Sequence, residues 1–287
     1  MDAICQTIEK ATGASAEFIS AAPLGGGCIN DTRRLETTGG TFFVKLNRPD
    51  FLEAFQAESL ALQEMADTQT IHVPQPICDG IADGGAFLVL EYIEMGSPRT
   101  ESQTQAGKQL AALHQYSGKT FGWHCDNTIG ATPQKNPFSN NWIDFYRQHR
   151  LGFQFDLAKR NGKPFREVDD LLNRLEDYFK DYTPEPSLLH GDLWGGNIGY
   201  GPGGEPVIFD PATYYGDRET DLAFTEMFGG FGPAFYRAYD EAWPRHSGHR
   251  IRKTLYNLYH YLNHHNLFGG GYADTAQSMI DELLRWE

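Results

Sequence analysis

Hydrophobic and polar positions follow two different patterns along this chain. Up to about residue 94, the apolar segments are short, and the clearest of them are continuous runs such as FFV at 42–44 and FLVL at 87–90. That pattern is typical of β-strands, and glycine-rich turns separate the segments. Helical spacing is present in only two of them. This part of the chain predicts helices over residues 2–12 and 52–65 and strands over residues 17–22, 32–36, 41–46, 77–81 and 86–91.

From about residue 100 onward, apolar residues recur every three or four positions, which is the helical period. Short apolar strands at 188–189 and 207–209 interrupt this pattern, and residues 117–138 predict a loop. The whole pattern indicates an α+β protein with a small β-rich N-terminal lobe (1–94) and a larger, mainly helical C-terminal lobe (95–287). The expected helices span residues 106–116, 142–161, 168–180, 221–228, 231–243, 249–268 and 272–286.

The stretch 188–217 carries the most specific chemistry. Asp192 follows His190 and Gly191, Asn197 comes five residues later, and Asp210 ends the next short strand. Phosphoryl transfer uses this order: a carboxylate that deprotonates the attacking hydroxyl, then an amide and a second carboxylate that ligate Mg²⁺. A buried Asp–Asn pair that caps a turn is the alternative. The ordered set, within about twenty residues, favours phosphoryl transfer.

A glycine run in the N-terminal half lies between two expected strands. Gly25, Gly26 and Gly27 could form a lid over phosphates, because glycine lets backbone N–H groups approach phosphate oxygens closely. A hairpin turn would use glycine equally well. The predicted hinge between the lobes follows the apolar strand at 86–91. There the backbone groups of Glu91 and Ile93 would contact adenine, although an ordinary exit from a strand has the same pattern.

Lys45 strengthens the nucleotide interpretation, because it is a single cation in the apolar segment FFVKL. An inward-pointing lysine at this position would contact the α- and β-phosphates and would need a carboxylate partner. An exposed edge lysine is the alternative. Glu58, in the following helix, is the predicted partner. Glu53 and Glu64 remain open as alternatives.

Composition limits the classes of partner. The formal net charge is −14, so the surface would repel nucleic acid and anionic membranes, although local donors can still bind ATP. The first residues lack the features of a signal peptide, and no apolar run reaches the roughly 18 residues of a membrane span. The four cysteines are scattered without metal-type spacing, which predicts reduced thiols in a cytoplasmic protein.

The residues after Asp210 differ from those of a protein kinase. Phe209-Asp210-Pro211-Ala212 replaces the D-F-G motif, and no A-P-E motif follows. Asp217 is expected to cap the next helix, with binding of a substrate amine as the alternative. The charged residues Arg218, Glu219 and Asp221 could form an ion network that braces the metal-binding loop.

Three histidines, at positions 260, 264 and 265, lie within one expected helix. Their spacing could place two imidazoles on one turn, as in metal pairs. No matching cysteine or acidic ligand is nearby, so a packed helix face is the favoured interpretation.

The segments LLHGDLWGGN, FDPATYYGDRETDLA and LNHHNLFGGGY together resemble the fructosamine kinase (ketosamine-3-kinase) family. That family belongs to the wider group of aminoglycoside-phosphotransferase-like kinases. GGGCIND, FFVKLN and FQAE resemble the family's N-terminal lobe, so the resemblance covers about residues 5–286. One departure is Tyr215, where the family often has tryptophan before Gly-Asp, and this puts the substrate packing in doubt.

The resemblance implies a two-lobed, protein-kinase-like fold and ATP-dependent phosphorylation of O3 on a ketosamine, a step in deglycation. It implies the following roles: Asp192 as base; Asn197 and Asp210 as Mg²⁺ ligands; Lys45 and Glu58 as the ATP-anchoring pair; Gly25, Gly26 and Gly27 as lid; Glu91 and Ile93 as hinge; and Trp194 and Tyr215 beside the sugar. Whether the amine is a small molecule or a protein side chain stays open.

The resemblance also implies a redox-sensitive disulfide between subunits at Cys28, so the chain would be a monomer or a redox-dependent homodimer. A small residue that fills the glycine loop is the alternative for Cys28. Two other functions compete with the ketosamine kinase. One is an aminoglycoside or other amino-sugar kinase, and the other is a nucleotide-binding regulator without turnover.

Overall fold

The structure, a computed structural model, describes residues 1–25 and 29–286 and divides into two compact units. The first unit contains Met1–Ser102 and Ile198–Pro211, and the second contains Gln103–Asn197 and the chain from Ala212 on. The segment 198–211 therefore packs with the N-terminal residues, although it lies in the C-terminal half of the sequence. The predicted boundary between residues 94 and 95 stays a prediction.

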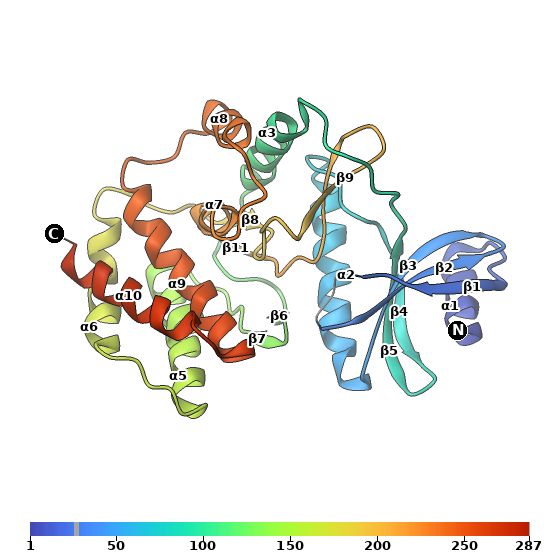
Figure 1. Cartoon of the computed structure of the whole chain (residues 1–287), viewed down its shortest axis with the longest axis horizontal. Helices are drawn as coiled ribbons and strands as arrows, with labels where there is room; N and C mark the ends of the chain where they lie inside the picture. The colour runs from blue at the N-terminus through green and yellow to red at the C-terminus, as the bar shows by residue number, and fades with distance from the viewer. Residues whose placement is uncertain (26–28, 287) are drawn as a thin grey trace. The chain divides into compact units, whose positions relative to one another are not determined.

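A five-stranded antiparallel sheet forms the centre of the first unit (Figure 1). The strand order β1-β2-β3-β5-β4 places β3 and β5 inside the sheet. Burial on both faces explains why β5 is an apolar run, with Ala86 to Leu90 buried. The strands span Phe18–Pro23 (β1), Asp31–Thr37 (β2), Gly40–Asn47 (β3), Pro76–Ala82 (β4) and Gly85–Glu91 (β5).

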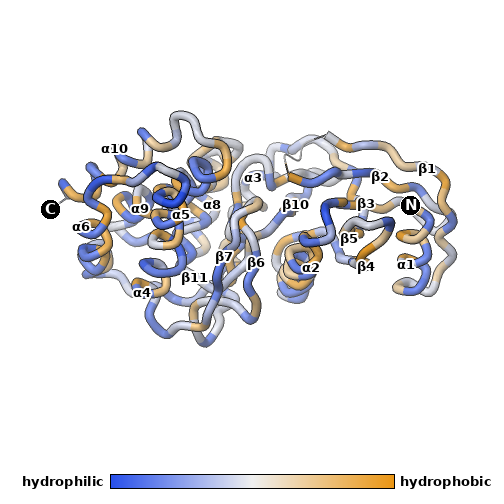
Figure 2. Tube along the Cα trace, turned by 90° about the horizontal axis from the view of Figure 1, so that it is seen from below, coloured by the Kyte–Doolittle hydropathy of each residue, from blue (hydrophilic) through white to orange (hydrophobic). Residues whose placement is uncertain are grey.

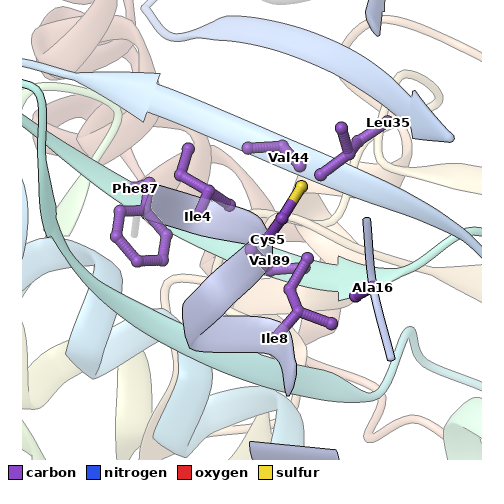
Figure 3. Packing of buried hydrophobic residues seen from close by; sticks show 8 residues of the cluster. All are labelled: Ile4, Cys5, Ile8, Ala16, Leu35, Val44, Phe87 and Val89. Carbon is purple, nitrogen blue, oxygen red and sulfur yellow. The ribbon is translucent and has the colours of Figure 1, made fainter. Parts of the chain in front are cut away.

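One helix covers each face of this sheet (Figure 1). Helix α1 (Asp2–Thr12) places Ile4, Cys5 and Ile8 against the sheet, and the Cys5 side chain points toward Val44 of β3 (Figure 3). Neighbouring residues in a strand face opposite sides, so the residue after Val44 faces away from α1. The remaining members of this core cluster are Ala16, Leu35, Phe87 and Val89.

Helix α2 (Leu52–Asp67) lies over the other face and follows the short 3-10 helix η1 (Pro49–Phe51). Its tube changes between orange and blue along the turns (Figure 2), as expected of a helix with one buried side. The buried side carries Phe55, Leu62 and Met65. A hairpin of β9 (Ile198–Tyr200) and β10 (Pro206–Ile208) completes the first unit.

The second unit is mainly helical, with a two-stranded sheet of β8 and β11 and a small hairpin of β6 and β7. Helix α9 packs against α5, α7 and α10 (Figure 1). The elements span Ser102–His114 (α3), Asn127–Ile129 (β6), Thr132–Gln134 (β7), Trp142–Tyr146 (α4), Arg147–Gly152 (η2), Phe153–Arg160 (α5), Val168–Asn173 (α6), Leu175–Phe179 (η3), Ser187–Leu189 (β8), Tyr214–Gly216 (β11), Glu219–Thr225 (α7), Pro233–Ala242 (α8), His249–Phe268 (α9) and Tyr272–Arg285 (α10).

Local differences from the expected elements have physical causes. The expected loop at 117–138 contains the β6–β7 hairpin, whose turn has Gly130 at φ 61°. The expected helix at 142–161 includes a π-helical turn, η2, between α4 and α5. Helix α7 begins at Glu219, two residues earlier than predicted, because Asp217 accepts the Glu219 N–H. In the described part of the chain, no helix is long and apolar enough to span a membrane.

Candidate active site

Lys45 is the centre of a charged group in the first unit. It lies on β3, opposite Leu88 of β5, and faces the side of the sheet that α2 covers. Its Nζ donates to Glu58 Oε1 and to Asp210 Oδ1, each at 2.6 Å, while only 3% of its side chain is exposed. The structure therefore brings together the predicted pair of Lys45 and Glu58, and it adds Asp210.

Charge pairing decides the protonation state of this group. Burial lowers the pKa of Lys45, but the carboxylates of Asp210 and Glu58 raise it more, so its net pKa is raised. Burial raises the pKa of Glu58, and the Lys45 cation opposes that shift. Lys45 is therefore a fixed cation, and its charge offsets only part of the rise that burial causes in the pKa of Glu58.

Asp210 has an unusual backbone. Its φ is 59°, in the left-handed region, which is uncommon for residues other than glycine and is found at sites where structure constrains the chain. Strand β10 leads directly to this position, and Ile208 N–H donates to His72 O, so the hairpin is attached to the segment after α2. The Asp210 side chain is 48% exposed, so it is accessible to a ligand while it contacts Lys45.

The remaining predicted nucleotide contacts of the first unit lie at strand ends. Gly25 is at the tip after β1, where Leu24 N–H donates to Thr32 O, and no atom lies within 4 Å of an added Cβ at Gly25. Glu91 ends β5 and donates its N–H to Gln75 O, so its carbonyl oxygen is the group to consider for adenine. Ile93 follows in the connecting segment.

Three predicted residues lie outside the described residues. They are Gly26 and Gly27 of the glycine run and the redox candidate Cys28.

Asp192 and Asn197 form a hydrogen-bonded pair in the second unit. Asn197 Nδ2 donates to the Asp192 carbonyl oxygen at 2.8 Å and to Asp192 Oδ2 at 3.0 Å. Both hydrogen bonds use Nδ2 of this buried side chain. They do not involve Oδ1, which is the amide atom that can ligate a metal. One residue thus holds the candidate base through two hydrogen bonds and keeps its own amide oxygen out of both of them.

A buried carboxylate from α7 fixes the loop that carries Asp192. Asp221 Oδ2 accepts the His190 N–H at 2.7 Å, and Asp221 Oδ1 accepts the Gly191 N–H at 2.8 Å. Gly191 has φ 82°, and an added Cβ there would lie 2.0 Å from Ala212 O. Only glycine fits this position, and the loop that precedes Asp192 is held on both sides.

Asp221 belongs to a longer network. It accepts from His114 Nε2 at 3.1 Å, and His114 Nδ1 lies 2.8 Å from the Tyr239 hydroxyl. Burial lowers the pKa of His114, so this histidine is neutral, donates from Nε2 and accepts at Nδ1. Burial raises the pKa of Asp221, but hydrogen bonds from His114 and from the Gly191 N–H lower it more, to below its usual value. Asp221 is therefore an ionised clamp.

Arg218, Glu219 and Asp221 were expected to form one ion network, but each of them binds different partners. Arg218 donates to the carbonyl oxygens of Trp243 and Pro244, and Glu219 pairs with Arg252 at 2.7 and 3.0 Å. Within this segment, Asp221 contacts the loop of the candidate base, where it accepts the N–H groups of His190 and Gly191.

Asp217 is fully buried. Its Oδ1 accepts from Tyr182 and from the Glu219 N–H, and its Oδ2 accepts from Tyr256. Burial, followed by repulsion from Glu219, raises its pKa to about 6. The capping interpretation agrees with these contacts, and binding of a substrate amine has no exposed oxygen to support it.

The two aromatic candidates differ in exposure. Trp194 is 37% exposed and packs edge-on against Phe228, with ring centroids 5.9 Å apart. Tyr215 lies on β11, partly buried beneath Gly118, where an added Cβ would lie 2.7 Å from its ring. Trp194 is therefore the more accessible of the two.

The histidines of α9 make packing and hydrogen-bond contacts within the second unit. The ring of His260 stacks on Phe224, and His264 Nδ1 lies 2.8 Å from His260 O. Among the described residues, no cluster of three or more His, Cys, Asp or Glu side chains could hold a metal ion. The packed-face interpretation agrees with these contacts.

Several supporting residues have no local signal in the sequence. His114, Tyr239 and Arg252 lie on helices far along the chain from their partners, and each was interpretable only as a helical position. A buried charged or polar residue in an apolar helical stripe is the signal that could have identified them.

The chain is similar to known proteins over nearly its whole length. The sequence profile described as fructosamine kinase matches residues 1–286. A probable ketoamine kinase from Synechocystis sp. is 49% identical, over 98% of this chain and 96% of its own length. A chloroplastic protein-ribulosamine 3-kinase from Arabidopsis thaliana is 43% identical, over 95% of this chain and 85% of its own length.

Solved structures show the same relationship. A candidate fructosamine-3-kinase from Haemophilus somnus superposes with a TM-score of 0.92 at 30% identity, over 98% of this chain and 97% of that one. An aminoglycoside phosphotransferase, at 16% identity and a TM-score of 0.61, shares the fold alone over 99% of this chain and 98% of its own. The predicted fold class, α+β and kinase-like, is confirmed.

Proposed function

The chain belongs to the fructosamine kinase family, and on that premise we propose that it transfers the γ-phosphate of ATP to O3 of a ketosamine. The observation that carries the proposal is the pair of Asp192 and Asn197, on a loop that Asp221 clamps. This arrangement holds a carboxylate in one orientation, as a general base requires. The kinase family by itself implies use of a nucleotide.

The proposed step balances as follows. Asp192 accepts the proton of the O3 hydroxyl while O3 forms a bond to the γ-phosphorus. The bond between the γ-phosphorus and the oxygen that bridges it to the β-phosphate breaks, and ADP leaves. The ketosamine 3-phosphate remains. In-line transfer of this kind depends mainly on positioning and charge stabilisation.

The residues that would position ATP belong to the first unit. Lys45, held by Glu58, would contact the α- and β-phosphates, and Gly25 with Gly26 and Gly27 would cover them. The carbonyl of Glu91 and the backbone of Ile93 would contact adenine. Burial of Lys45 strengthens its interaction with a phosphate, because little water competes for the cation.

Asn197 and Asp210 are the proposed ligands of Mg²⁺. Both offer hard oxygens, and the Asp210 carboxylate is half exposed next to Lys45. When bound, Mg²⁺ would neutralise the negative charge of the transferring phosphate. The chain's own contribution is to fix each residue within its own unit, Asn197 through its hydrogen bonds to Asp192 and Asp210 through its left-handed backbone.

Turnover with a substrate panel tests the proposal. We expect ADP formation with ribulosyl-, fructosyl- or erythrulosyl-lysine, phosphate at O3 in the product, and no turnover of an aminoglycoside. Asp192→Ala should abolish the rate. Asp156→Ala, an exposed carboxylate on α5, is the matched control and should keep it. A wild-type rate that is confined to the aminoglycoside, or full activity in Asp192→Ala, would contradict the proposal.

Assembly forms a separate part of the proposal. We propose that oxidation links two copies of the chain through Cys28 and that reductant separates them. Subunit mass and activity, measured with and without reductant for wild type and Cys28→Ala, decide this. An unchanged response in the variant would remove Cys28 from the explanation. The cytoplasmic location expected from the cysteines stays a prediction.

A further inference from the structure

Four aromatic rings follow one another from the loop of Asp192 to the end of α9. The ring centroids of Trp194 and Phe228 are 5.9 Å apart, those of Phe228 and His264 are 5.1 Å apart, and those of His264 and Phe268 are 5.8 Å apart. Phe228 is 43% exposed and Phe268 is 57% exposed. These four residues are called the aromatic surface below.

The backbone under the aromatic surface is fixed. An added Cβ at Gly195 would lie 2.5 Å from Gly229 O, and one at Gly230 would lie 2.5 Å from Gly195 Cα. Gln103 braces the same loop, since its Nε2 donates to Gly230 O and its Oε1 accepts the Gly232 N–H. The segment that presents Phe228 is thus held directly against the segment that presents Trp194. Exposed aromatics on a braced backbone are typical of binding surfaces.

His264 adds one polar atom to this surface. Its Nδ1 faces the carbonyl oxygen of His260 at 2.8 Å, and a carbonyl oxygen only accepts, so Nδ1 carries the hydrogen. Nε2 is then an acceptor in the neutral imidazole. Burial lowers the pKa of His264, which favours this neutral form. The surface therefore combines apolar rings with one acceptor for an N–H or O–H group.

We propose that the aromatic surface binds the amine part of the ketosamine, the group attached to the sugar nitrogen, and thereby sets which amines are accepted. This inference rests on the proposed function and deepens it. Trp194 is two residues from Asp192 on the same loop. In a ketosamine, four covalent bonds separate the nitrogen from O3, so the nitrogen lies within about 5 Å of the reacting oxygen. A substituent on that nitrogen then extends from the sugar, and the aromatic surface extends from the same loop.

The chemistry of the surface specifies the class of amine. A protonated secondary amine is attracted to the face of an aromatic ring, best of all to tryptophan. Beyond the nitrogen, Phe228 and Phe268 offer apolar contact on either side of the single acceptor of His264, which favours aromatic or aliphatic substituents over negatively charged ones. The preferred substrate is therefore a ketosamine whose amine carries a large apolar group.

Two ketosamines with the same sugar test the inference: ribulosyl-phenethylamine and ribulosyl-methylamine. The measured quantity is the ratio of their kcat/KM values. For wild type we expect the phenethylamine compound to be favoured. In Phe228→Ala, and separately in Phe268→Ala, this ratio should fall about two- to tenfold, which corresponds to about 0.5–1.5 kcal/mol for one aromatic contact. Phe138→Ala, which removes a 65% exposed ring from another segment of the second unit, should leave the ratio unchanged.

The ratio corrects for any loss of folded protein, because both substrates are measured on the same preparation. A ratio that stays at the wild-type value in both variants overturns the inference and leaves the proposed function intact. A change in subunit mass without a change in ratio would identify the surface as an interface between copies, and it would also overturn the inference. If wild type phosphorylates neither compound nor any other ketosamine, the proposed function fails, and the inference fails with it.

Discussion

Replacing Gly191 by alanine should damage both the stability and the rate of this protein, for reasons that can be separated. Gly191 has φ 82°, a backbone conformation that costs a residue with a side chain about 1–2 kcal/mol. In addition, its new Cβ would lie 2.0 Å from Ala212 O. An ordinary contact between carbon and oxygen is about 3.3 Å, so the loop must move by about 1.3 Å.

The surroundings resist that movement. The His190 and Gly191 N–H groups donate to the ionised Asp221, and the Ala212 N–H donates to His190 O at 2.8 Å. A hydrogen bond to a charged group contributes about 1.5–3 kcal/mol, so loss of one of them brings the expected destabilisation to about 2.5–5 kcal/mol. A displacement of this size next to Asp192 should lower kcat by about 100-fold.

Gly162→Ala is the matched control for Gly191→Ala. Gly162 has nearly the same φ, 86°, but nothing lies within 4 Å of its added Cβ. It should lose only the conformational cost of about 1–2 kcal/mol and keep its rate. Urea unfolding and ADP formation measure the two effects. If Gly191→Ala loses no more stability than Gly162→Ala, or keeps kcat within threefold of wild type, then the packing at Ala212 does not control the loop.

Three further predictions concern the charged groups. Asp221→Asn should lower the urea midpoint and kcat together. The pKa of Asp221 in the folded protein lies below its usual value. The loss of unfolding free energy in Asp221→Asn should therefore have its full size above the carboxyl's usual pKa of about 4, and it should disappear as the pH falls through the folded pKa. A loss that grows in acid would contradict this. Lys45→Met removes the cation between Glu58 and Asp210. In a coupled ADP assay, this variant should have a kcat/KM for ATP that is at least 100-fold lower than that of wild type. A near-normal kcat/KM would exclude Lys45 from phosphate binding. Chelation of divalent cations by EDTA should stop ADP formation and added Mg²⁺ should restore it; turnover that persists in EDTA would remove Asn197 and Asp210 from the metal role.

Local patterns in the sequence identified the elements that carry the site because those patterns are strong. The apolar run before Glu91 predicts a central strand, and the helix that carries Glu58 has regular spacing. The pairing of Lys45 with Glu58 could be inferred because a lysine buried in a strand needs a carboxylate. The third member, Asp210, could not be inferred as a Lys45 partner, since 165 residues separate the two and a pairing at that distance leaves no periodic signal.

The supporting shell of the second unit was harder to predict for the same reason. Asp221 was considered as a member of an ion network, but its actual partners are two backbone N–H groups and a neutral histidine from α3. The sequence alone does not specify which buried polar groups meet across helices, since each one is satisfied by any partner of suitable geometry. For Asp217, the helix-capping pattern was the better guide, and its burial supports that interpretation.

Shortly after Asp192 the chain passes from one compact unit to the other. The stretch around Asp192 is therefore not a single compact loop. Asn197 is the last residue of its segment in the second unit, and Ile198–Pro211 belongs to the first. The loop that precedes the candidate base is fixed by Asp221, within the second unit, whereas Asp210 is fixed by Lys45, within the first. Each carboxylate thus has its own clamp in its own unit. Because the clamps are separate, Asp221→Asn should disturb Asp192 without changing the Lys45–Asp210 pair, and Lys45→Met should do the reverse.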